Sequence, residues 1–155
     1  MIGPVSLDVA DPEVAAQVVA VQRLAYRFEA DLIGSEAIPP LHESEADVAA
    51  SREDFRGVYV HGRLAALLSS EWDDGALTIC RLAVHPDLSR RGLGSLLVHE
   101  ALARAGEAGV RVSTGSANAP ALALYARLGF RQTGEREPVP GLRITELERG
   151  AERAA

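Results

Sequence analysis

The sequence contains no lysine, since all sixteen of its basic side chains are arginine. This absence excludes a Schiff-base lysine and the lysine of a P-loop. A lone cysteine, Cys80, cannot form an internal disulfide or a thiolate metal cage, so a reducing cytoplasm is the expected location. No apolar run approaches the roughly 18 residues that span a bilayer, so no membrane association is expected. The four histidines lack the spacing of a zinc site, and no metal is expected.

Length and composition are those of one globular domain. The chain has 155 residues, of which 47% are hydrophobic and 25% are charged. It is long enough to bury a core without disulfides or metals. We expect a single domain over residues 1–150 and a disordered or frayed tail over residues 151–155.

Acidic residues are concentrated in one segment. Residues 29–54 hold eight acids and one base, so the segment carries a net charge of −7. The whole chain carries −6, so the remaining residues together carry +1. Such a segment repels nucleic acid, and no basic stripe outweighs it elsewhere. It would attract a small cationic partner. A merely solvated, soluble surface is the alternative interpretation, and the charge alone favours it.

Hydrophobic spacing and turn residues predict a mixed α/β domain. Strands are expected at residues 5–9, 77–84, 110–115, 130–135 and 142–147, with a hairpin at 57–70. Helices are expected at residues 12–34, after Ser44, at 92–109 and at 118–129. The first helix should bury one face, made by Val14, Val18, Val21, Ala25 and Phe28. Prolines at 39 and 40 should keep residues 38–41 extended.

The fold class follows from the order of these elements. Residues 77–115 form a strand–helix–strand unit, whose two strands should be parallel and joined by a right-handed crossover. Antiparallel strands flank this pair. The predicted architecture is therefore a mixed, mostly antiparallel sheet with one parallel pair and helices on both faces.

The turn before the helix expected at residues 92–109 carries a chemical signal. Residues 89–95 read Ser-Arg-Arg-Gly-Leu-Gly-Ser, and they lead directly into the helix. A glycine-rich turn at a helix N-terminus exposes several backbone N–H groups, which suits a phosphate or diphosphate. Leu97 stands where a Rossmann turn needs its third glycine, so neither that motif nor a P-loop fits. A plain connector is the alternative interpretation of the turn alone.

A longer pattern resembles a known family. Residues 80–87 read Cys-Arg-Leu-Ala-Val-His-Pro-Asp, the Arg-Arg-Gly-Leu-Gly turn follows, and Asn118 precedes Tyr125 by seven residues, with Gly-Phe at 129–130. Together these motifs resemble the GNAT superfamily of N-acetyltransferases. The resemblance covers residues 75–137 well, and the element order extends it over nearly the whole chain.

The resemblance implies a set of residues that bind acetyl-CoA. The two parallel strands would splay apart to form a slot for this co-substrate. Backbone groups of the central strand would hold the pantetheine arm, and turn amides would hold the diphosphate. Asn118 would contact the pantetheine, and Tyr125 would approach the sulfur as the proton donor. The strand residues are Leu82, Ala83 and Val84, and the turn residues are Arg90, Arg91, Gly92, Leu93, Gly94 and Ser95.

Two positions depart from the family pattern and leave the general base open. The turn begins with Ser89 where the family usually has Gln or Arg, and Thr78 stands where some members carry a glutamate base. Glu71, at the end of the hairpin strand, is the leading candidate base, acting directly or through a water. His85 is expected to be a turn residue at the end of the strand and is the alternative candidate for the base. Cys80 is expected to be a small, buried apolar residue.

The predicted activity is acetyl transfer from acetyl-CoA to an amine. The transfer would be direct, within a ternary complex, and the acceptor would be a small molecule or a peptide with an amine. The alternative is a GNAT-like module that senses or binds acyl-CoA without turnover. The family resemblance also leaves a homodimer open.

Overall fold

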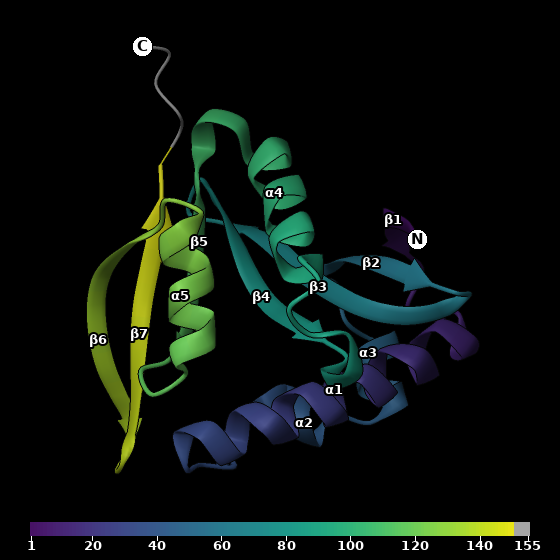
Figure 1. Ribbon diagram of the computed structural model, residues 1–155, viewed down its shortest axis with the longest axis horizontal. Helices are drawn as coiled ribbons and strands as arrows, with labels where there is room; N and C mark the ends of the chain where they lie inside the picture. The colour runs from purple at the N-terminus through teal and green to yellow at the C-terminus, as the bar shows by residue number, and fades with distance from the viewer. Residues whose placement is uncertain (151–155) are drawn as a thin grey trace.

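A seven-stranded sheet forms the centre of the molecule in the computed structural model, which describes residues 1–150 (Figure 1). The strand order is β1-β2-β3-β4-β5-β7-β6. All neighbours are antiparallel except β4 and β5, which are parallel. The predicted fold class is therefore confirmed. The tail expected at residues 151–155 lies outside the described residues.

The strands match the predicted segments with small shifts at their ends. They are β1 (Ile2–Leu7), β2 (Asp54–Val60), β3 (Arg63–Asp73), β4 (Ala76–Val84), β5 (Val110–Gly115), β6 (Arg131–Val139) and β7 (Leu142–Arg149). The first strand begins earlier than expected and ends at Leu7, since residues 9–10 form a turn before the first helix. The hairpin turn at His61 and Gly62 has positive φ at both residues, as its sequence predicts.

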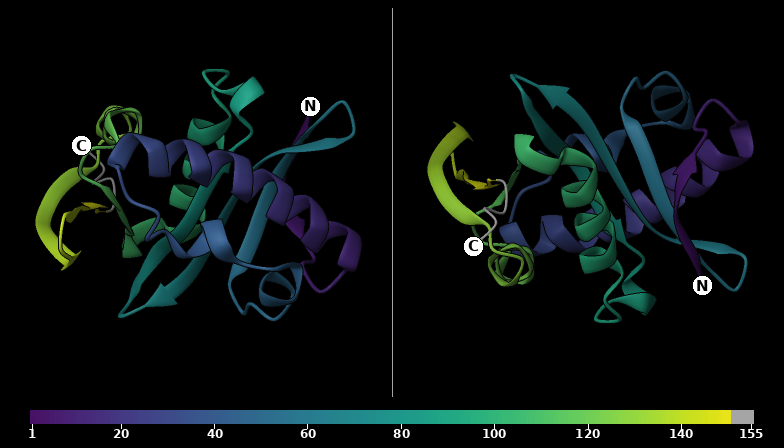
Figure 2. Two further views of the ribbon diagram at one scale, coloured as in Figure 1. Left: turned by 90° about the horizontal axis from the view of Figure 1, so that it is seen from below. Right: turned by 90° about the horizontal axis from the view of Figure 1, so that it is seen from above.

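Helices cover both faces of the sheet (Figure 2). One face carries α1 (Pro12–Ile33), α2 (Pro39–His42) and α3 (Glu45–Ala49), and the other carries α4 (Leu93–Ala105) and α5 (Ala119–Arg127). Short 3₁₀ turns, η1 (Pro86–Leu88) and η2 (Gly106–Ala108), flank α4. No helix within residues 1–150 is both long enough and apolar enough to cross a membrane.

Helix ends follow the capping residues that the sequence contains. The Asp11 carboxylate accepts from the Glu13 N–H, and Gly34 ends α1 in the left-handed conformation. Ser44 and Asp47 form a capping box at α3. These three ends were predictable because each depends on side chains only a few residues away.

Three predictions about local structure are wrong. Residues 39–42 form the short helix α2, because prolines are tolerated in a first turn that needs no N–H donor. The helix expected to reach Gly109 ends at Ala105, and Gly106 takes a positive φ of 55°. Phe28, expected in the core, is 58% exposed, because the buried face of α1 includes Gln22 and Tyr26 instead.

Each face of the sheet has its own hydrophobic core. The α4 and α5 side centres on Leu97, Val98 and Leu68, all fully buried. The α1 side centres on Val18, Val48 and Leu67, also fully buried. β3 contributes to both cores, because successive side chains of a strand point to opposite faces.

Leu97→Ala should test the core beneath α4. Its side chain is fully buried, so truncation should lower the free energy of unfolding by about 3 kcal/mol. Urea denaturation would measure the change. Leu24→Ala, at a leucine on α1 that is 48% exposed, is the control and should change the free energy by under about 1 kcal/mol. Equal effects of the two substitutions would contradict this assignment of the core.

Candidate active site

The parallel strands β4 and β5 part after a short paired stretch. Their register runs over three pairs, Leu77 with Val110, Thr78 with Arg111 and Ile79 with Val112, and no pairing is recorded beyond them in residues 1–150. β4 then turns away from β5 (Figure 1). A cavity of about 300 Å³ lies at the opening, lined by residues from both strands and from α1, α2 and α5. The predicted splay of the two strands is confirmed.

A β-bulge at Cys80 accompanies this separation. Ser69 of β3 pairs with Arg81 and Ser70 pairs with Ile79, so Cys80 is the extra residue on β4. The prediction that Cys80 is simply buried in the strand is wrong, because it is half-buried and lines the cavity. Burial, and then the charges of Glu53 and Glu71, raise the pKa of its thiol to about 12. The thiol is therefore protonated at neutral pH.

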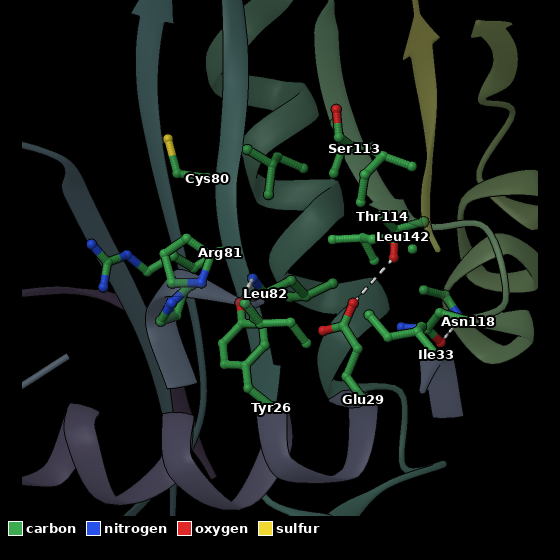
Figure 3. Close-up of a pocket in the computed structure, with 18 of the residues that line it drawn as sticks. Tyr26, Glu29, Ile33, Cys80, Arg81, Leu82, Ser113, Thr114, Asn118 and Leu142 are labelled. Atoms are coloured by element: carbon green, nitrogen blue, oxygen red, sulfur yellow. Dashed lines mark hydrogen bonds between the residues drawn. The ribbon is translucent and has the colours of Figure 1, made fainter. Parts of the chain in front are cut away.

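One face of α1 forms a wall of the cavity. Tyr26, Glu29 and Ile33 follow one another at helical spacing, and all three line the cavity (Figure 3). At the end of this face Ile33 packs against Gly115 of β5. A β-carbon at Gly115 would lie 2.6 Å from the Ile33 Cγ2 atom, so only glycine allows this approach. α1 is thereby held against the end of β5.

Glu29 is the carboxylate that enters the cavity. Its Oε1 atom accepts a hydrogen bond of 3.4 Å from the Thr114 hydroxyl of β5 (Figure 3). Burial raises the pKa of Glu29, while hydrogen bonds with Asn118 and Thr114 act in the opposite direction. No arginine or histidine within residues 1–150 forms a salt bridge with it.

α5 brings Asn118 and Tyr125 to the same cavity. The Asn118 side chain caps the helix by accepting from the Ala121 N–H at 3.2 Å, and Asn118 also lines the cavity. Tyr125 is 3% exposed, and its ring packs edge-on against Phe130 with centroids 5.2 Å apart. Burial, followed by the charge of Glu29, raises the pKa of Tyr125, so its phenol stays protonated and can donate.

The edge of β4 that faces β5 offers backbone donors. The His85 N–H donates to Ala65 on β3, so alternation along the strand turns the N–H groups of Leu82 and Val84 toward the opening. The Leu82 N–H donates to the Tyr26 hydroxyl at 3.1 Å, whereas no described acceptor takes the Val84 N–H. Of the three predicted strand residues, only Leu82 lines the cavity, and Ala83 is buried on the α1 side.

A buried arginine ties the cavity wall together. Arg81 is 7% exposed and stacks on Phe55, with its guanidinium carbon 4.9 Å from the ring centroid. It donates to Glu53 and Gln22 at 3.0 Å each, and also to Glu43. Burial alone would lower the pKa of Arg81, but the two carboxylates outweigh burial and raise it. This cluster joins α1 and the segment around α3 to β4.

The Arg-Arg-Gly-Leu-Gly turn presents unused backbone donors. α4 begins after Gly92 without a side-chain cap, and Arg90 and Gly92 have positive φ values of 64° and 79°. The N–H groups of residues 90–95 have no acceptor in the described part of the chain. The exposed side chains of Arg90 and Arg91 form no ion pair there. The turn therefore offers backbone N–H donors beside two positively charged side chains, as suits an anion.

Glu71, the predicted base, lies beside the opening and not in the cavity lining. It is exposed on β3 opposite Thr78. Its carboxylate, that of Glu53 and the Cys80 sulfur lie within 4.8 Å of one another. Glu53 Oε1 accepts hydrogen bonds from Arg81 and from Ser69, which ties this group to the buried arginine. His85 caps η1 by accepting from the Asp87 N–H, as expected of a turn residue.

Half of the eight acids in the segment 29–54 form ion pairs with arginines of the chain. Glu43 and Glu53 bind Arg81, Glu36 pairs with Arg27, and Asp54 pairs with Arg56. Glu29 is the acid of this segment that lines the cavity. These ion pairs balance part of the negative charge of the segment within the fold.

Comparison with known proteins identifies the family. The sequence profile of the acetyltransferase (GNAT) family matches residues 21–130, which is more than half of the chain. The chain belongs to this GNAT family. It is also 37% identical over 133 residues to the UPF0157 protein YqkA of Bacillus subtilis (strain 168). That match covers 85% of this chain but only 39% of YqkA, so the chain spans well under half of this curated relative.

Solved GNAT structures share the fold at low sequence identity. The ribosomal-protein-S18-alanine N-acetyltransferase of Escherichia coli is 20% identical, with a TM-score of 0.70 over 92% of this chain and 91% of that one. PaiA N-acetyltransferase of Thermoplasma acidophilum, solved with coenzyme A, is 17% identical, with a TM-score of 0.71 over 94% and 96%. YncA of Salmonella typhimurium, solved with acetyl-CoA, is 16% identical, with a TM-score of 0.68 over 91% and 92%.

The structure brings together some of the predicted GNAT residues and adds others. Leu82, Asn118 and Tyr125 line one cavity, and the turn 90–95 opens α4 as expected. Sequence reasoning missed the cavity position of Glu29 and the anchoring role of Arg81. A usable signal was present for Glu29, which falls one turn after Tyr26 on a helix whose buried face contains the polar residue Gln22.

Arg81→Met should show how much the fold depends on the buried cluster. The substitution leaves Glu43 and Glu53 without their shared cation, so we expect a loss of about 3–5 kcal/mol in the free energy of unfolding, measured in urea. Arg131→Met is the control, because it removes an arginine that is 80% exposed from its pair with Glu148, and should cost under about 1 kcal/mol. A loss below 1 kcal/mol for Arg81→Met would refute the anchoring role.

Proposed function

We propose that this chain is an acetyl-CoA-dependent N-acetyltransferase that moves the acetyl group directly to an amine of a small molecule or peptide. One observation carries the proposal: β4 parts from β5 over a cavity lined by a tyrosine, and the turn of unused amides that follows β4 brings Gly94 close to Leu82 and Val84. Relatives with this fold have been solved with coenzyme A and with acetyl-CoA, which supports the same co-substrate here.

The residues present fit the chemistry of this co-substrate. The N–H groups of residues 90–95, with Arg90 and Arg91, would hold the diphosphate. Backbone groups of Leu82 and Val84 would hold the pantetheine arm along the strand edge left unpaired by β5, whereas those of Ala83, the third predicted strand residue, face β3. Asn118 would contact the same arm from the start of α5. The Val84 N–H, turned toward the opening, would stabilise the oxyanion.

Tyr125 would protonate the departing thiolate. Its phenol is protonated at neutral pH, lies in the cavity and is oriented by the contact with Phe130. The protonated Cys80 thiol is a poor nucleophile, which favours direct transfer over an acetyl-cysteine intermediate. Glu71 stays a predicted general base beside the opening, acting directly or through a water.

Incubation with acetyl-CoA and a panel of amines tests the activity. We expect amine-dependent release of the CoA thiol, an acetylated amine detected by mass spectrometry, and a higher melting temperature with CoA. The rival function, an acyl-CoA sensor without turnover, predicts the rise in melting temperature without amine-dependent thiol release. No rise and no release would refute both functions.

Tyr125→Phe isolates the proton donor. The variant keeps the ring contact with Phe130 but removes the hydroxyl, so we expect kcat to fall by about 100-fold with little change in the CoA-dependent melting shift. Tyr59→Phe is the matched control, because that hydroxyl bonds Gln17 away from the cavity. An unchanged kcat in Tyr125→Phe would remove Tyr125 from the mechanism.

A further inference from the structure

One unbalanced negative charge lies in the cavity. Among the residues that line it, Glu29 is the one carboxylate, and the two lining arginines are already engaged elsewhere. Arg81 binds Glu43 and Glu53, while Arg136 donates to Glu146 at 3.0 Å. The thiol of Cys80 and the phenols of Tyr26 and Tyr125 are protonated and neutral. A ligand in this cavity therefore meets one negative charge without a cation to balance it.

The walls around this charge are largely apolar. Ile33, Ile38 and Pro39 line the cavity on the side of α1 and α2, and Leu142 and Ile144 line it from β7. A single carboxylate between apolar walls suits a ligand with one ammonium group and an apolar body. A second ammonium group would have to lie against apolar side chains without a counter-charge, which is costly.

We propose that Glu29 binds the ammonium group of a monoamine acceptor with an apolar body and removes its proton. This inference rests on the proposed acetyltransferase function and names its acceptor class and its base. The carboxylate lies in the same cavity as Tyr125, and its charge acts on that phenol. Glu29 and Tyr125 thus form a base and an acid on opposite elements, α1 and α5, around one space.

The proton transfers balance with these two groups. The first ammonium proton passes to the Glu29 carboxylate and from there to solvent. The neutral nitrogen then forms a bond to the thioester carbonyl carbon, and the carbon–sulfur bond breaks. The sulfur takes the Tyr125 proton, and the Tyr125 oxygen recovers a proton from the new amide nitrogen. The products are the N-acetylated amine, CoA thiol and one released proton.

The burial of Glu29 supports its role as the base. It raises the pKa of this carboxylate, so Glu29 accepts a proton more readily than an exposed acid would. The raised pKa also makes the stability depend on pH. The free energy of unfolding falls as the pH rises from the ordinary carboxylate pKa through the raised pKa of the folded chain, because the folded chain binds the proton more tightly than the unfolded chain. Glu29→Gln should therefore leave the melting temperature unchanged or raise it, which separates loss of activity from loss of folding.

Glu29→Gln, assayed with hexylamine and acetyl-CoA at pH 7, tests the proposal directly. We expect kcat/KM to fall by about 100-fold or more, with the CoA-dependent melting shift retained. Glu13→Gln is the matched control: it removes an exposed acid from the same helix, about 24 Å away along the axis. A fall of less than threefold in Glu29→Gln, or an equal fall in Glu13→Gln, would overturn the assignment of the base.

Three further measurements sharpen the test. The wild type should lose kcat/KM as pH falls through the Glu29 titration, and Glu29→Gln should lack that limb. The titratable and charged groups that line the cavity with Glu29 are Tyr26, Cys80, Arg81, Tyr125 and Arg136. The pKa values of Tyr26, Cys80, Arg81 and Tyr125 are all raised, so these four keep their charge states near neutral pH. Aniline is already neutral at pH 7, so Glu29→Gln should lose far less activity with aniline. 1,6-Diaminohexane should be at least about tenfold poorer than hexylamine.

The possible outcomes distinguish a failure of the Glu29 proposal from a failure of the proposed acetyltransferase function. A wild type that binds CoA but acetylates no amine overturns the proposed function, and the role of Glu29 with it. An active wild type with an active Glu29→Gln overturns the role of Glu29 alone. A large loss in Glu71→Gln without one in Glu29→Gln assigns the base to Glu71. Equal or better use of 1,6-diaminohexane overturns the apolar monoamine class.

Discussion

The end of pairing between β4 and β5 is the constraint on which the rest of the site depends. After Ile79 and Val112 the two strands no longer bond each other, so backbone donors of β4 face an opening inside the domain. Such groups are costly unless they find partners. Tyr26 supplies one by accepting the Leu82 N–H, and the extra residue at Cys80 turns the strand away from β5. An interior opening of this kind suits a long ligand that offers hydrogen bonds along its length.

A buried ion cluster keeps that opening in shape. Arg81 follows the bulge directly and binds carboxylates from two segments that precede β3 in the chain, Glu43 and Glu53. Its charge is stabilised only because all these groups meet at one place, since a lone buried arginine would be destabilising. The acid-rich segment therefore does two things: Glu43 and Glu53 hold the arginine that lines the cavity, and Glu29 gives the cavity its charge.

Local signals in the sequence predicted local structure well. The helix caps at Asp11, Ser44 and Asn118, the end of α1 at Gly34 and the hairpin turn at Gly62 depend on neighbours within a few residues. Each of them forms where the local sequence favours it. Errors arose where a longer-range contact decided the outcome. Phe28 fits the apolar spacing of its helix yet lies outside, because the packing of Gln22 and Tyr26 against β4 rotates α1. The sequence around Cys80 fits an ordinary strand, because a bulge is defined by the pairing with the neighbouring strand.

The sequence by itself determined the order of elements, the parallel strand pair, the glycine-rich turn before α4 and the membership of Asn118 and Tyr125 in one helix. These features follow from spacing and backbone preference, which act over short stretches of chain. Only the tertiary structure decided that Glu29 lies in the cavity with Tyr125 while Glu71 lies beside it. The reason is physical: the proton affinity and the reach of a carboxylate depend on which segments surround it, and these come from distant parts of the chain.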